Sequence, residues 1–176
     1  MKGRHEGNYN LYIDDRDKEF LRAYRKATEE LLKTNGSFRL HEALDKARSS
    51  ATSRYFVSEN RAYNVLRSID LYYEELARCR QKGEDPPPFP LSSFTYQRQR
   101  MYFHMYNDFN QLRKDNPNIP IMTLVVMTCA LPAREFYMNL NSASSILGRI
   151  HANMKKFGII TSREPRKTLR DMNRYR

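Results

Sequence analysis

Apolar residues recur at helical spacing along most of the chain. In the first half, stripes with spacings of three, four and seven predict helices at residues 14–35, 40–50 and 58–80. The inward stripe of the third of these helices consists of Ala62, Val65, Leu66, Ile69, Tyr73 and Leu76. Asp14 and Ser58 are predicted to be N-caps, because short polar side chains accept hydrogen bonds from free backbone N–H groups at a helix start.

The second half of the chain shows the same order of elements. Helices are predicted at residues 94–114, 122–131 and 139–156, and either Asn139 or Asn141 is expected to cap the last one. The expected apolar stripe of the first of these helices consists of Tyr102, Phe103, Tyr106, Phe109 and Leu112.

The stretch between the halves, residues 82–93, reads K-G-E-D-P-P-P-F-P-L-S-S. Prolines interrupt helices and favour an extended polyproline conformation, so a stiff linker is predicted there. A ligand motif for an SH3-type domain is the less favoured alternative.

The two halves also match residue by residue. Residues 129–150 resemble residues 48–69 at a shift of 81, with the aromatic pair Phe136-Tyr137 falling on Tyr55-Phe56. The stripe Ala143, Ile146, Leu147, Ile150 falls on Ala62, Val65, Leu66, Ile69. A self-match at fixed spacing indicates an internal repeat. The aromatic pairs are expected to plug the space between helices.

The predicted fold is therefore all-α, with two tandem three-helix repeats joined by a proline-rich linker. The expected divisions are a flexible arm at 1–13, repeats at 14–81 and 94–156, the linker at 82–93 and a basic tail at 157–176.

Within each repeat, a short helix, a turn and a longer helix resemble the helix-turn-helix units of DNA-binding proteins. In such units the second helix lies in the major groove. With the aliphatic stripes facing inward, the outward residues are Asn60, Arg61, Asn64 and Arg67 in the first repeat and Asn141, Ser142, Ser145 and Arg149 in the second. Asn and Arg can contact adenine and guanine through paired hydrogen bonds. The turn at 51–57 is longer than that of a tight helix-turn-helix, which favours a plain packing unit, and both interpretations stay open at this point.

Charge favours a polyanionic partner. The chain holds 31 Lys and Arg against 20 Asp and Glu, and its last 26 residues hold eight against two. Cations that neutralise phosphates gain free energy from counterion release. The expected partner is DNA, in duplex form, with RNA and nonspecific polyanion binding as alternatives. The expected phosphate contacts are Lys155, Lys156, Arg163, Arg166, Lys167 and Arg170.

Motifs of enzymes and metal sites are absent from the sequence. There is no phosphate-binding G-x-x-x-x-G-K-[ST], H-E-x-x-H, C-x-x-C or G-x-S-x-G, and the four histidines are scattered. We therefore expect no catalysis, no metal and no cofactor. Cys79 and Cys129 are expected to be buried thiols in a reducing compartment. No apolar run has the length of a membrane helix and no signal peptide is visible, so a bacterial cytoplasm or a virion is the expected location, with no membrane partner.

The segment P-A-R-E-F-Y-M-N at 132–139 is similar to a pattern in small proteins of gut bacteria and their phages, and this resemblance implies no function. The favoured hypothesis is a non-enzymatic DNA-binding protein that serves a mobile element or phage as a regulator or accessory factor. One alternative is a structural or assembly protein whose basic tail contacts nucleic acid nonspecifically. Another is an inhibitor or adaptor that binds a protein through an aromatic surface, since the chain has 12 Tyr and 9 Phe.

Overall fold

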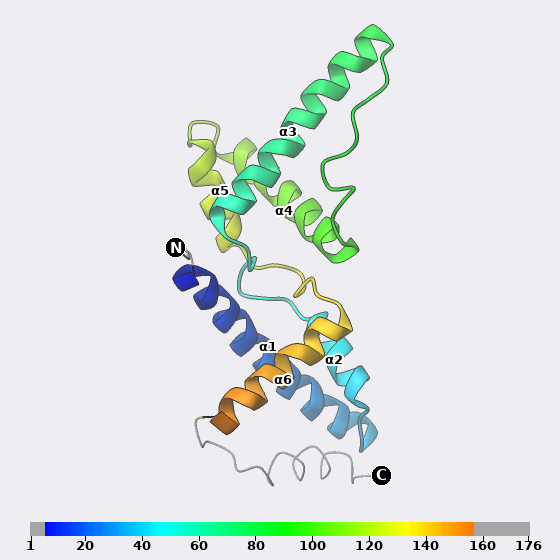
Figure 1. Ribbon diagram of the computed structural model, residues 1–176, viewed down its shortest axis with the longest axis vertical. Coiled ribbons are helices and arrows are strands. Elements are labelled where there is room, and N and C mark those ends of the chain that lie inside the picture. Colours follow the sequence, from blue (N-terminus) through cyan, green and yellow to red (C-terminus); the bar gives the residue numbers. More distant parts are fainter. Residues whose placement is uncertain (1–5, 157–176) are drawn as a thin grey trace. The chain divides into compact units, whose positions relative to one another are not determined.

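The computed structural model describes the backbone of residues 6–156 and the side chains of residues 15–152 (Figure 1). That part of the chain folds as six helices and contains no strand, which confirms the all-α prediction. The helices are α1 Glu6–Asn35, α2 Leu40–Arg48, α3 Glu59–Lys82, α4 Tyr96–Asp115, α5 Ile121–Ala130 and α6 Leu140–Lys156.

Helix starts agree with the sequence only in part. Ser58 occupies the N-cap position of α3, although its side chain makes no cap hydrogen bond. Asn139 caps α6, since its Oδ1 accepts a hydrogen bond from the backbone N–H of Ser142 at 2.7 Å. Helix α1 begins at Glu6, so a cap at Asp14 and a flexible arm at 1–13 are wrong for the residues that the structure describes. The cost of a single Gly7 in a helix, about 1 kcal/mol, does not stop a helix of this length.

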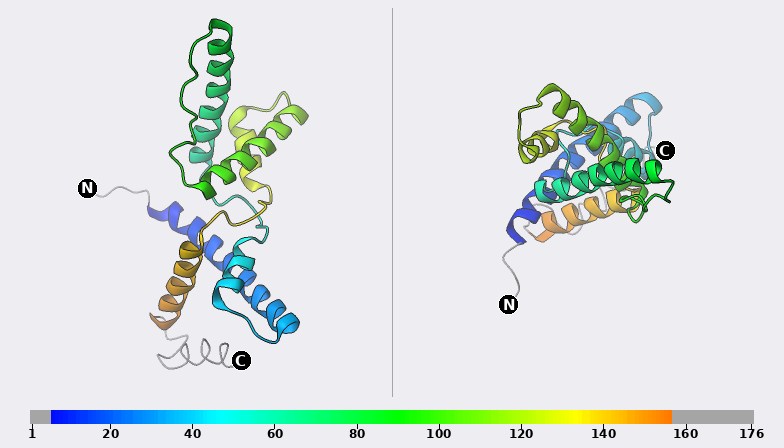
Figure 2. Two further views of the ribbon diagram at one scale, coloured as in Figure 1. Left: turned by 90° about the vertical axis from the view of Figure 1, so that its right-hand side faces the viewer. Right: turned by 90° about the horizontal axis from the view of Figure 1, so that it is seen from above.

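The six helices form two compact units that do not follow the two halves of the sequence. The first unit contains α1, α2 and α6, and the second, Ser53–Ala133, contains α3, α4 and α5. Helix α6 packs against α1 and α2, and Figure 2 shows the orange α6 beside the blue α1 and the cyan α2. The predicted repeats at 14–81 and 94–156 are therefore wrong as structural units. Each unit takes two helices from one half and its third helix from the other half.

Two hydrogen bonds at corresponding positions mark this exchange. The backbone N–H of Tyr55, ahead of α3, donates to the carbonyl of Cys129 in α5 at 3.1 Å. The backbone N–H of Phe136, ahead of α6, donates to the carbonyl of Arg48 in α2 at 2.9 Å. A shift of 81 converts one pair of residues into the other. The turn ahead of each third helix therefore docks on the second helix of the other half.

The core of the first unit is built from large side chains of α1 and small ones of α2. Phe20 of α1 meets Phe136 edge to face, with ring centroids 5.3 Å apart. The other buried apolar residues of α1, α2 and α6 include Tyr24, Ala27, Ala43, Leu44, Ala47, Ala143 and Ile146. Phe136 and its counterpart Tyr55 are 6% and 1% exposed, so the plug interpretation is confirmed for these two rings.

The core of the second unit includes a buried carboxylate between α3 and α4. Asp70 is 8% exposed and accepts hydrogen bonds from Tyr106 Oη at 2.8 Å and from Arg113 Nη1 at 3.0 Å. Burial and the Asp70 carboxylate both raise the pKa of the Tyr106 hydroxyl. The apolar core around this network includes Leu66, Ile69, Tyr102, Met105, Phe109, Leu124 and Val125. Asp70 thus joins two helices without being left unpaired, which matters because an unsatisfied buried charge is costly.

Two residues expected in this core lie outside it. Phe103 is 58% exposed, and Met105 takes the buried place on α4 instead. Successive helical residues differ by about 100°, so the stripe that contains Tyr102, Met105 and Phe109 leaves Phe103 on another side of the helix. Tyr73 of α3 is also largely exposed, where its ring stacks on Tyr106.

The proline-rich segment does not link the two units. It connects α3 to α4 within the second unit and returns along α3, as Figure 1 shows. Gly83 ends α3 with a left-handed backbone (φ 69°), and residues 84–89 have no regular structure. Phe89 packs edge-on against Tyr72 with ring centroids 5.1 Å apart, and Leu91 is fully buried. The prediction of an interdomain linker at 82–93 is therefore wrong, because apolar residues on both sides of Pro90 anchor the segment.

We predict that cutting the proline-rich segment leaves the protein assembled. A protease site inserted after Asp85 would separate α1, α2 and α3 from α4, α5 and α6, and each unit contains helices from both fragments. The fragments should co-elute in native buffer and separate only in concentrated urea. Phe136→Ala removes a buried ring, worth about 3–5 kcal/mol, and should lower the urea concentration at which they part. Fragments that separate in native buffer while keeping their helical content would contradict the exchanged arrangement.

Candidate nucleic-acid interface

The predicted contact residues of α3 reach the surface, but their cations are engaged. Asn60, Arg61 and Asn64 are exposed, whereas Arg67 is half-buried and lies 3.8 Å from the Glu74 carboxylate. Arg61 lies beside the Tyr102 hydroxyl. Burial raises the pKa of Tyr102, and the hydrogen bond with Arg61 acts in the opposite direction. These two arginines therefore already have partners within the second unit.

The predicted contact residues of α6 are all exposed. Asn141, Ser142, Ser145 and Arg149 lie on the solvent side of the helix. Ser145 Oγ donates to the Asn141 carbonyl at 2.8 Å, and Arg149 Nη2 binds Asp17 Oδ2 of α1 at 2.8 Å. The backbone of Lys155 and Lys156 is part of α6, but their side chains lie outside the described part of the chain. Arg163, Arg166, Lys167 and Arg170 also lie outside it.

The two predicted helix-turn-helix pairs, α2 with α3 and α5 with α6, are each divided between the two units. Helix α2 belongs to the first unit and α3 to the second, so the predicted pair is divided. Instead, α2 packs with α6 and α5 packs with α3. The long turn explains this division, because Tyr55 in it is held by α5 through its backbone and by Asp108 of α4 through its hydroxyl at 2.6 Å.

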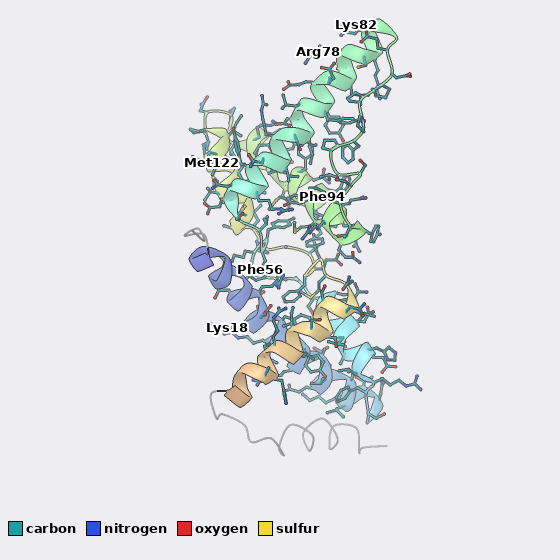
Figure 3. All side chains as sticks on the ribbon, in the orientation of Figure 1. Lys18, Phe56, Arg78, Lys82, Phe94 and Met122 are labelled. Atoms are coloured by element: carbon teal, nitrogen blue, oxygen red, sulfur yellow. The ribbon has the colours of Figure 1, made fainter. Side chains whose placement is uncertain are left out.

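A basic face on α1 was not predicted from the sequence. Five exposed cations lie within a single sector of this helix: Lys18, Arg22, Arg25, Lys26 and Lys33. Lys18 is labelled in Figure 3. Asp15 and Glu29 share the sector, and nearby Glu30 is bound to Lys46 of α2 at 2.8 Å, which lowers the pKa of its carboxyl. Arg22 and Arg25 make no ion pair with a described residue. The three- and four-residue spacing of these cations was visible in the sequence.

The sequence segments that the two units draw on differ in charge. The segments of the first unit, residues 1–52 and 134–176, contain 21 Lys and Arg against 12 Asp and Glu. The segment of the second unit, residues 53–133, contains 10 against 8. Among the described side chains, residues 15–52 and 134–152 contain 11 Lys and Arg against 8 Asp and Glu, so the feature of the first unit that suits a polyanion is the basic face of α1. Helix α3 of the second unit has the outward side chains that are better suited to contacts with bases.

Burial makes the Cys129 thiol a poor nucleophile. Loss of solvent raises its pKa from 9.0 to about 12, and the charge of Glu59 adds to this increase. Among the described residues, no group of three or more His, Cys, Asp and Glu side chains could hold a metal ion. Within the same residues, no helix is long and apolar enough to cross a membrane.

No protein-family model matches this chain, and the searches of curated proteins and of solved structures returned no match either. Any functional assignment therefore depends on the residues and geometry of this chain.

We predict that Cys129 resists thiol reagents in the folded protein. In Cys79→Ser, which leaves Cys129 as the only thiol, labelling at pH 8 should proceed only as fast as the protein unfolds. The pKa of the Cys129 thiol is higher in the folded protein than in the unfolded one, so its contribution to the free energy of unfolding is fully present below pH 9. This contribution decreases as the pH rises toward 12. Labelling in urea gives the fully accessible rate, and a similar rate in native buffer would contradict the buried position.

Proposed function

We propose that the protein is a non-enzymatic DNA-binding protein whose affinity for duplex DNA comes mainly from the first unit. The observation that carries this proposal is the basic face of α1, where five exposed cations share one sector of the helix. From Lys18 to Lys33 this face extends roughly 22 Å along the helix, at 1.5 Å per residue. Duplex DNA carries one negative charge per about 1.7 Å of axis, so several phosphates would lie within reach of such a face.

Helix α6 supplies polar side chains to the same unit. Its exposed side has Asn141, Ser142 and Ser145, and the bond between Arg149 and Asp17 joins this helix to α1. Phosphate contacts position a protein on the duplex, while contacts to base edges select the sequence. We therefore propose that α1 contacts phosphates and that the start of α6 contacts bases. We further propose that the protein acts as a regulator or accessory factor of a mobile element.

The first consequence is salt-dependent binding that depends on α1. For 6 to 8 neutralised phosphates, log K should fall against log salt with a slope of about −5 to −7. The double variant Arg22→Gln, Arg25→Gln removes two cations that make no ion pair with a described residue and should flatten this slope by about 1.8. Arg80→Gln, Lys82→Gln makes the same charge change at the exposed end of α3 in the second unit and is the matched control. Fluorescence polarisation with a labelled duplex measures the salt dependence of binding for both double variants. Equal slopes for the two variants would contradict the proposal.

The second consequence concerns sequence preference. Asn141→Ala should cost about 1–3 kcal/mol of binding on a duplex selected from random sequences, and far less on unselected DNA. Asn64→Ala, the corresponding change on α3, should leave both affinities nearly unchanged. Both side chains are exposed, so thermal unfolding should shift little in either variant. A selective loss in Asn64→Ala alone would assign base contacts to the second unit and contradict the division of work proposed for α1 and α6.

A further inference from the structure

Helix α4 exposes two aromatic rings that take no part in its core. Tyr96 is 66% exposed and Phe103 58%, the highest values among the large apolar side chains that the structure describes. The opposite side of α4 packs into the second unit through Tyr102, Met105 and Phe109. Folding of this unit therefore does not account for the two outward rings.

The two rings belong to one stripe of α4. Tyr96 and Phe103 are seven residues apart, so they lie within about 20° of each other around the helix and roughly 10.5 Å apart along it. Arg100 lies between them on the same side, with its guanidinium carbon 5.7 Å from the centroid of the Tyr96 ring. The stripe thus alternates an aromatic ring, a cation and a second ring.

The rest of the stripe is polar and contains no acid. It continues through Asn107, Gln111 and Lys114, all of them exposed. The two carboxylates of this helix lie to the side of the stripe and have partners. Asp108 accepts a hydrogen bond from Tyr55, and Asp115 accepts hydrogen bonds from Gln111 at 2.9 and 3.1 Å. The stripe itself therefore carries two cations, Arg100 and Lys114, and no acid.

We propose that this face of α4, formed by Tyr96, Arg100, Phe103 and Lys114, binds single-stranded nucleic acid. Unpaired bases stack on Tyr96 and Phe103, and Arg100 contacts the phosphate backbone that runs between them. Aromatic side chains stack on every type of base, so this binding is tolerant of sequence. Bases within a duplex stack on one another and cannot offer their faces to rings on a helix surface, which selects the single strand.

This surface is distinct from the duplex interface proposed for the first unit, and its salt response differs. The second unit has nearly balanced charge, so stacking supplies a larger share of the affinity. With two phosphate contacts, from Arg100 and Lys114, the slope of log K against log salt is about −1.4. A steep slope for the single strand, equal to that for the duplex, would overturn the assignment to α4.

The test uses the full chain and a short fluorescein-labelled oligothymidylate in polarisation titrations. Tyr96→Leu and Phe103→Leu keep an apolar, helix-favouring side chain but remove the ring, and each should weaken binding roughly 5-fold to 100-fold. Arg100→Gln should also weaken it, whereas Arg98→Gln, an equal charge change on the opposite side of α4, should not. Circular dichroism and thermal unfolding establish that each variant is folded.

The outcomes separate this inference from the proposed function. Oligothymidylate binding that depends on Tyr96 and Phe103 supports the inference even if duplex binding is absent. Unchanged affinity in both Leu variants, or equal effects of Arg98→Gln and Arg100→Gln, overturns it even if Arg22 and Arg25 govern duplex binding. Self-association of the wild-type chain in sedimentation that both Leu variants abolish, with no oligothymidylate binding, overturns it in favour of a protein interface.

Discussion

The arrangement of this protein depends on how the turn ahead of each third helix is held. Tyr55 is tied to the end of α5 by its backbone N–H and to α4 by its hydroxyl, and its ring is almost fully buried. Phe136 occupies the corresponding place on α2, with its ring against Phe20 of α1. Since each turn leads directly into a long helix, fixing the turn also decides which pair of helices the third helix joins. Both units follow from this single type of contact.

The exchange of helices also changes how the charge is distributed. In a tandem arrangement, the acid-poor end of the chain would follow a repeat made of α4, α5 and α6. Instead, α6 joins α1, whose exposed side already carries five cations. The basic face of α1 and the exposed polar side of α6 therefore belong to one unit, while the other unit stays close to neutral. This separation is compatible with the two proposals, phosphate contacts in one unit and aromatic stacking in the other.

Each unit joins two of its helices through a buried carboxylate. In the second unit, Asp70 connects α3 to Tyr106 and Arg113 of α4 as a buried, fully partnered carboxylate. In the first unit, the position that corresponds to Asp70 is His151, and α1 is joined to α6 by the pair of Asp17 and Arg149. Asp17 is also 8% exposed and binds Arg16 as a second partner. Removing one partner of a buried pair is strongly destabilising, so each unit depends on a buried carboxylate and its arginine.

The sequence by itself determined the helical class, the order of six helices and most inward positions, because a stripe such as Ala62, Val65, Leu66 and Ile69 depends only on local helical periodicity. It also placed Asn141 and Asn64 outward correctly. Only the tertiary structure decided which helices share a core. The two halves carry nearly the same inward stripes, so either third helix fits either pair by pattern, and specific contacts of Tyr55 and Phe136 select the partner. Tertiary packing also decided the exposure of Phe103, because Met105 occupies the buried position on α4.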